Sequence, residues 1–99
     1  MSTNVLLHLN EQQGSDEARA AFNQLLKENF WIKMHPVYMS WCCKYSDDVY
    51  DVQEEVIAEV KRLAAMAGVV GVHAVVQCGN DQAFWFEYDV SARSDTLPH

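Results

Sequence analysis

Five stretches of the chain carry the apolar pattern of β-strands: short apolar runs, or alternation of apolar and polar residues with a period of two. They are residues 5–9, 31–34, 37–45, 69–78 and 83–90. His35-Pro36 separates the second from the third, because the residue before a proline is disfavoured in the helical region. The turn-forming residues Gly79–Gln82 make the last two a predicted β-hairpin over 70–90.

Two stretches between these strands show the three-to-four-residue spacing of amphipathic helices. Ser15 is a good N-cap, and acidic residues follow it in the first turn, where the helix dipole favours them. The apolar stripe of this first helix comprises Ala18, Phe22, Leu25, Leu26 and, one turn on, Phe30. A second helix follows the capping residues 46–48, and Gly68 is expected to end it. Its stripe comprises Val49, Val52, Val56, Val60, Leu63 and Ala67.

This order of elements predicts an α+β fold. We expect a ferredoxin-like split βαββαβ sheet with two helices on one face and an extra C-terminal strand. If 31–34 is not a strand, the order becomes βαβαββ. The length of the chain suits a single domain, which we place over residues 4–90, with a flexible C-terminal tail over 91–99.

Strand alternation sorts side chains onto a face packed against the helices and an open face. The packed face is predicted to carry Val5, Leu7, Leu9, Val37, Met39, Trp41, Cys43, Val72, Ala74 and Val76. The open face is predicted to carry Leu6, His8, Tyr38, Ser40, Cys42, Lys44, His73, Val75 and Gln77. This open face is partly apolar, and the last strand adds Phe84, Trp85 and Phe86 at a sheet edge. We therefore expect these aromatic residues to bind a partner, and the chain to form a homodimer.

Charge narrows the choice of partners. Seven basic residues face fourteen acidic ones, which gives a formal net charge of -7. This balance disfavours general nucleic-acid binding, which needs a basic stripe, and favours a protein partner with a basic surface. The N-terminus has no basic and apolar leader, and no apolar run approaches the ~20 residues that span a bilayer, so we expect a cytoplasmic protein without membrane contact. The three cysteines form no CxxC pair, and no cofactor or metal is expected.

Candidate chemistry lies on the predicted open face, where His8, His73, Ser40 and Cys42 would meet if the first strand is central. Two histidines could act as general base and general acid in metal-free RNA cleavage, with Lys44 stabilising the phosphate. The candidate catalytic residues are therefore His8, His73, Ser40 and Lys44. Alternatively, both histidines are interface residues that hydrogen-bond locally, or His8, His73 and Cys42 bind a metal.

The order of elements, together with the segment from Trp41 to Asp48 that leads into a helix, resembles a known group. These are small ferredoxin-like proteins of the CRISPR-adaptation nuclease and GhoS antitoxin type. The resemblance implies a dimer in which the extra C-terminal strand joins the partner's sheet, and, for some members, endoribonuclease activity. The metal-dependent nucleases of the group carry an aspartate at the end of the first strand, where this chain has Asn10.

Two functional hypotheses follow. The first is a dimeric regulatory protein of the toxin–antitoxin type, possessing metal-independent endoribonuclease activity if it is an enzyme, with RNA as its substrate. The alternative is a non-catalytic acidic interaction protein, comparable to a phage-encoded inhibitor. Its second helix, through Glu54, Glu55 and Glu59, would occupy the basic surface of a protein that handles nucleic acid.

Overall fold

The structure is a computed structural model that describes residues 2–34, 40–46 and 49–90. These residues form an antiparallel sheet of five strands and two helices. The strand order is β2-β3-β1-β4-β5. The elements are β1 (Thr3–Gln13), α1 (Asp16–Glu28), β2 (Ile32–Lys33), β3 (Ser40–Tyr45), α2 (Val49–Ala67), β4 (Gly71–Cys78) and β5 (Phe84–Asp89). The predicted turn at His35-Pro36, the strand residues 37–39 and the predicted cap at residues 47–48 lie outside the described residues.

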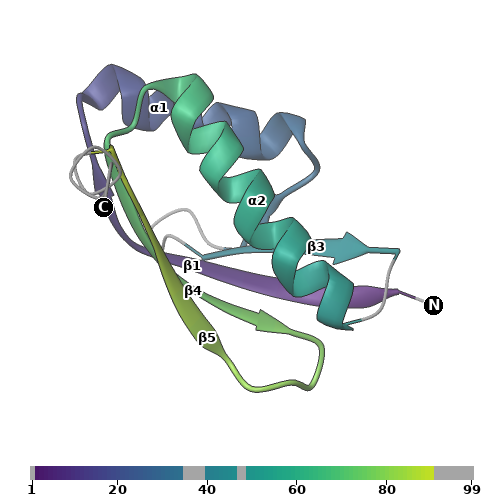
Figure 1. The fold of residues 1–99 in the computed structure, drawn as a ribbon. Helices are drawn as coiled ribbons and strands as arrows, with labels where there is room; N and C mark the ends of the chain where they lie inside the picture. The colour runs from purple at the N-terminus through teal and green to yellow at the C-terminus, as the bar shows by residue number, and fades with distance from the viewer. Residues whose placement is uncertain (1, 35–39, 47–48, 91–99) are drawn as a thin grey trace, which may run out of the picture.

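The topology is the predicted split βαββαβ arrangement with one extra strand. The short stretch at 31–34 does contain a strand, because Ile32 pairs with Cys42 and Lys33 with Trp41. Both helices of the described chain lie against the same face of the sheet, and β5 lies beside β4 (Figure 1). The α+β prediction with the helices on one face is therefore confirmed.

A single apolar core fills the space between the helices and the sheet. Every second residue at the start of β1 points into it, and Leu7 is fully buried in the middle of the strand. Trp41 of β3 and Phe22 of α1 are fully buried as well. The buried strand residues that were predicted to face the helices are Val5, Leu7, Leu9, Trp41, Val72, Ala74 and Val76, while Cys43 is half-buried against the same core.

Strand β1 is longer than its apolar run predicts. Residues 10–13 are polar and were expected to end the strand, yet Glu11, Gln12 and Gln13 pair with β4. The register shifts between Leu9 and Glu11, so Asn10 occupies a β-bulge. A bulge adds one residue to one strand and reverses the phase of alternation beyond it. Glu11 and Gln13 therefore lie on the open face.

Helix α1 begins as predicted and ends earlier than its apolar pattern indicates. The Ser15 hydroxyl accepts a hydrogen bond from the N–H of Ala18 at 3.0 Å, so Ser15 is the N-cap. Phe30 was expected on the buried stripe, but it follows the helix with φ of 72° and is 83% exposed. Trp31 takes the core position instead: its N–H donates to the carbonyl of Leu26 at 3.0 Å and its side chain is 2% exposed.

The end of α2 agrees with the prediction at Gly68 and differs two residues later. Gly68 has φ of 87°, a conformation that glycine adopts at little cost, and its N–H donates to the carbonyl of Ala64 at 3.1 Å. The apolar run predicted as the next strand begins at Val69, whereas β4 begins at Gly71. Val70 precedes β4 and is 48% exposed, whereas Val69 is buried in the core. The strand therefore starts two residues later than its apolar run predicts.

Candidate functional site

The open face of the sheet carries a band of apolar side chains, here named the apolar band. Ile32, Leu6 and Trp85 in this band are exposed, and Cys42 and Val75 are half-buried. Cross-strand register places Ile32, Cys42 and Leu6 in one row, and Val75 beside Trp85 in the next. Leu6 is 42% exposed, Ile32 66% and Trp85 62%. An apolar surface of this kind on a sheet face is typical of an interaction site. As predicted, Leu6, Cys42 and Val75 belong to the open face.

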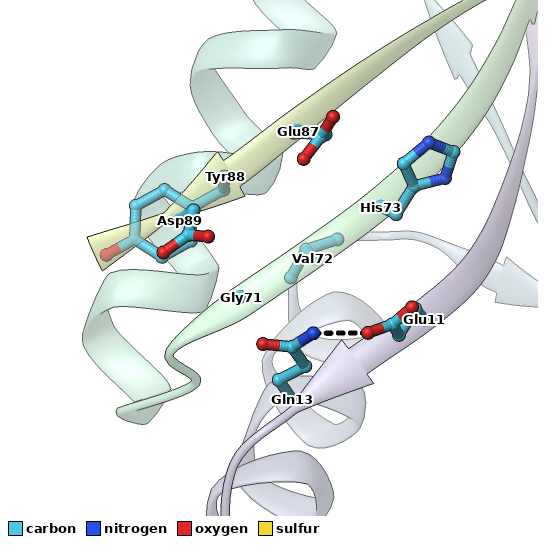
Figure 2. A pocket seen from close by; sticks show the side chains of 8 residues that line it. All are labelled: Glu11, Gln13, Gly71, Val72, His73, Glu87, Tyr88 and Asp89. Carbon is cyan, nitrogen blue, oxygen red and sulfur yellow. Dashed lines mark hydrogen bonds between the residues drawn. The ribbon is translucent and has the colours of Figure 1, made fainter. Parts of the chain in front are cut away.

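A second feature of the open face is a hollow of about 140 Å³ near the ends of β1 and β5, here named the acidic hollow. Its acidic side chains are Glu11 on β1 and Glu87 and Asp89 on β5 (Figure 2). Glu11 and Glu87 lie opposite His73 from the two neighbouring strands. No lysine or arginine of the described chain is among the residues that line it. The described side chains that line the hollow are therefore acidic and not basic.

Gly71 lines the acidic hollow on β4. It lies between Gln13 on β1 and Asp89 on β5 in the sheet register. A Cβ atom at this position would come within 2.9 Å of Oε1 of Gln13, which is closer than ordinary contact. The amide of Gln13 in turn donates to the carboxylate of Glu11, as Figure 2 shows.

His73 is held in place at the border between the hollow and the apolar band. Its ring stacks on the indole of Trp85, with centroids 5.4 Å apart and planes inclined by 20°. Its Nδ1 lies 3.1 Å from Nδ2 of Asn10. An amide nitrogen is a donor, so Nδ1 accepts and the neutral ring carries its proton on Nε2. Two neighbours therefore fix the orientation of this imidazole.

His8 makes a separate contact on the same face. Its Nδ1 lies 2.9 Å from Oγ of Ser40, its cross-strand neighbour on β3. On the other side His8 pairs with Val75, two residues along β4 from His73. The structure thus brings His8 and Ser40 together and leaves each histidine with its own hydrogen-bond partner.

Lys44 lies away from these groups. It pairs with Asn4, four residues along β1 from His8, which corresponds to about 13 Å at the rise of a β-strand. Metal-free RNA cleavage needs an acid, a base and a cation around one phosphate. The described face puts carboxylates, not a cation, beside His73, and these would repel a phosphate.

The acidic residues predicted to bind a partner fall into two groups. Glu54 and Glu55 are exposed on α2, which lies on the other side of the sheet from the apolar band. Glu59 is different: its Oε2 accepts hydrogen bonds from Nε1 of Trp31 at 2.9 Å and from the hydroxyl of Tyr45 at 2.7 Å. Glu59 is half-buried and links α2 to β3 and to the segment before β2, whereas Glu54 and Glu55 are exposed.

The aromatic residues of β5 separate by alternation. Phe86 is 8% exposed and Phe84 is half-buried, and both pack against the core. Trp85 points to the opposite, open face, where it is 62% exposed. Of the three aromatic residues predicted to bind a partner, Trp85 is the one that presents its ring to solvent.

The Tyr45 hydroxyl gives a prediction about alkaline pH. Burial, followed by the hydrogen bond to Glu59, raises the pKa of Tyr45 well above its ordinary value of 10.0. The unfolded chain thus releases this proton at a lower pH than the folded chain, so the stabilisation is complete below about pH 10 and falls as pH rises further. Burial also raises the pKa of the Cys43 and Cys78 thiols, which act in the same direction.

We expect the free energy of unfolding, measured by urea denaturation between pH 8 and pH 11, to decrease with pH above the ordinary thiol pKa of 9.0, and more steeply above the ordinary tyrosine pKa of 10.0. In Tyr45→Phe, which cannot ionise at this position, the decrease above pH 10 should be smaller. An identical slope in both proteins would contradict the assigned role of Tyr45. The thiols contribute to both proteins equally and cancel in the comparison.

Sequence reasoning missed the carboxylates of the acidic hollow. Glu87 and Asp89 alternate with buried Phe86 and Tyr88, and that pattern was sufficient to place them on the open face. Glu11 gave no such signal, because the bulge at Asn10 reverses the alternation.

The described residues contain neither a cluster suited to a metal ion nor a membrane-spanning helix. No group of three or more histidine, cysteine, aspartate or glutamate side chains in residues 2–34, 40–46 and 49–90 is arranged to hold a metal ion. Neither helix of the same residues is both long and apolar enough to cross a membrane. No protein-family model, curated protein or solved structure matches the chain significantly.

Proposed function

We propose that this chain is a non-catalytic interaction protein that binds and regulates a basic protein through the open face of its sheet. The observation that carries the proposal is the exposed apolar band beside the acidic hollow. Such a combination is typical of an interface whose centre is apolar and whose edge is charged. The net charge of -7 adds long-range attraction toward a basic partner.

A second copy of the chain fits this face less well. Among the described residues, the charged side chains of the face are Lys44, Glu11, Glu87 and Asp89. If two copies packed face to face, each would bring three carboxylates and one ammonium group into the interface. The excess of like charges there would be unfavourable. A homodimer through the outer edge of β5 is compatible with the proposal, since it leaves the open face accessible.

The second candidate is a dimeric metal-independent endoribonuclease of the antitoxin type. The 2.9 Å contact between His8 and Ser40, with His73 on the same face, is the observation in its favour. The carboxylates beside His73 and the distance to Lys44 count against it.

Affinity capture from the native host tests the proposal. The bait is the full chain, and the face variant is Trp85→Asp. Met66→Asp is the matched control, because Met66 lies on α2 and is exposed to the same 62%. We expect basic proteins that bind the unmodified bait and the Met66→Asp bait, are lost from the Trp85→Asp bait, and elute as salt is raised.

Two other results would contradict the proposed function. Identical protein sets on the unmodified and Trp85→Asp baits would refute binding through this face. Cleavage of single-stranded RNA by the pure protein, abolished in His8→Ala and in His73→Ala, would establish the second candidate instead.

A further inference from the structure

Resting on the proposed function, we infer that the open face binds an extended segment of another protein that carries a large apolar side chain and an arginine two residues apart. The apolar side chain covers Val75 and Trp85. The arginine reaches the acidic hollow, with its guanidinium beside Glu87 and Glu11.

The spacing of the two features supports an extended segment. Trp85 and Glu87 are two residues apart on β5 and point to the same face, so their side chains emerge about 7 Å apart. Residues i and i+2 of an extended chain lying along β5 repeat the same distance. One apolar side chain and one cationic side chain of such a segment would therefore meet both features together.

The chemistry of the hollow favours an arginine over other cations. Its carboxylates are spread over β1 and β5, and among the described residues no three ligand groups converge on one metal ion. A guanidinium is planar and has five N–H donors, so it can bond to carboxylates that are too far apart for a single ion. The flat His73–Trp85 stack beside the hollow, with planes inclined by 20°, offers a surface on which a guanidinium packs.

Apolar and charged contacts have separate roles in this arrangement. Trp85 and Val75 supply apolar area at the centre of the contact, where large side chains contribute most of the binding energy. Glu11 and Glu87 supply selectivity, because a neutral or acidic side chain beside them brings no positive charge to these two carboxylates. A phosphate group would be repelled, because it carries the same sign of charge as these carboxylates.

The test begins with a phage-displayed library of random 12-residue peptides, selected on the intact chain and counter-selected on Trp85→Asp. We expect the selected peptides to share an apolar residue and an arginine two residues apart. A synthetic peptide of that sequence should lose at least about tenfold in affinity when arginine is replaced by the neutral citrulline. Glu87→Gln should cause a similar loss for the arginine peptide and little change for the citrulline peptide.

Glu54→Gln is the matched control, since Glu54 is an exposed carboxylate on α2, and it should bind the arginine peptide like the unmodified chain. Selected peptides that lack arginine but compete for the face would overturn this inference and leave the proposed function standing. Equal affinity of the Glu87→Gln chain and the unmodified chain for the arginine peptide would also overturn it. Failure of the selection to give any binder sensitive to Trp85→Asp would overturn both.

Discussion

Leu7→Ala is expected to lower the free energy of unfolding by about 2–5 kcal/mol, whereas Leu6→Ala should lower it by less than about 1 kcal/mol. The two leucines are neighbours on β1 and differ in the face they occupy. Leu7 is fully buried between the sheet and the helices, so its truncation leaves a cavity. Leu6 is 42% exposed on the open face, where water and neighbouring side chains fill the space that truncation leaves.

Urea denaturation followed by circular dichroism measures both changes under one set of conditions. The pair forms its own control, because the strand, the residue type and the substitution are the same. Binding should show the reverse order: Leu6→Ala weakens capture of the partner, and Leu7→Ala leaves it intact at temperatures where the variant is folded. Equal destabilisation by the two substitutions would contradict the assignment of the open face.

Glu59→Ala has the second-largest expected effect, a loss of about 2–4 kcal/mol in the free energy of unfolding. The substitution removes the acceptor for Nε1 of Trp31 and for the hydroxyl of Tyr45. Trp31 is 2% exposed, so its N–H cannot turn to bulk water in exchange. An unsatisfied donor of this kind costs about 1–3 kcal/mol.

Glu54→Ala serves as the control for the helix, because it removes an exposed carboxylate one turn and a half earlier in α2. It should change stability by no more than about 0.5 kcal/mol. The double variant with Tyr45→Phe tests the link directly. If Glu59 and Tyr45 interact as the 2.7 Å contact indicates, the two losses are not additive. Additive losses would show that they act independently.

Together these predictions divide the molecule into a stabilising side and a binding side. The core and the Glu59 contacts hold the helices on the sheet, and substitutions there change unfolding. The apolar band and the acidic hollow are exposed, and substitutions there should change partner binding with little effect on unfolding. The physical basis of the division is burial, since truncation costs stability where apolar area has left water.

The sequence by itself determined the elements and most of their faces. The period of two in the strands and of three to four in the helices identified the α+β order and the inward residues such as Leu7, Trp41 and Val76. Ser15 and Gly68 marked a helix start and a helix end, because their roles depend on local backbone geometry. The same alternation placed His8, Ser40 and His73 on the open face. These features depend on interactions between residues close together in the chain.

Tertiary structure alone decided the features that make up the candidate site. Pairing with β4 extends β1 through its polar residues, and the bulge at Asn10 places Glu11 on the same face of the sheet as Glu87 of β5. Packing also placed Trp31 in the core instead of Phe30, and gave Glu59 two hydrogen-bond donors from distant segments. Each of these depends on strand register or on contacts between residues far apart in sequence. Local periodicity carries no information about such contacts, because one inserted residue reverses the face of all that follow.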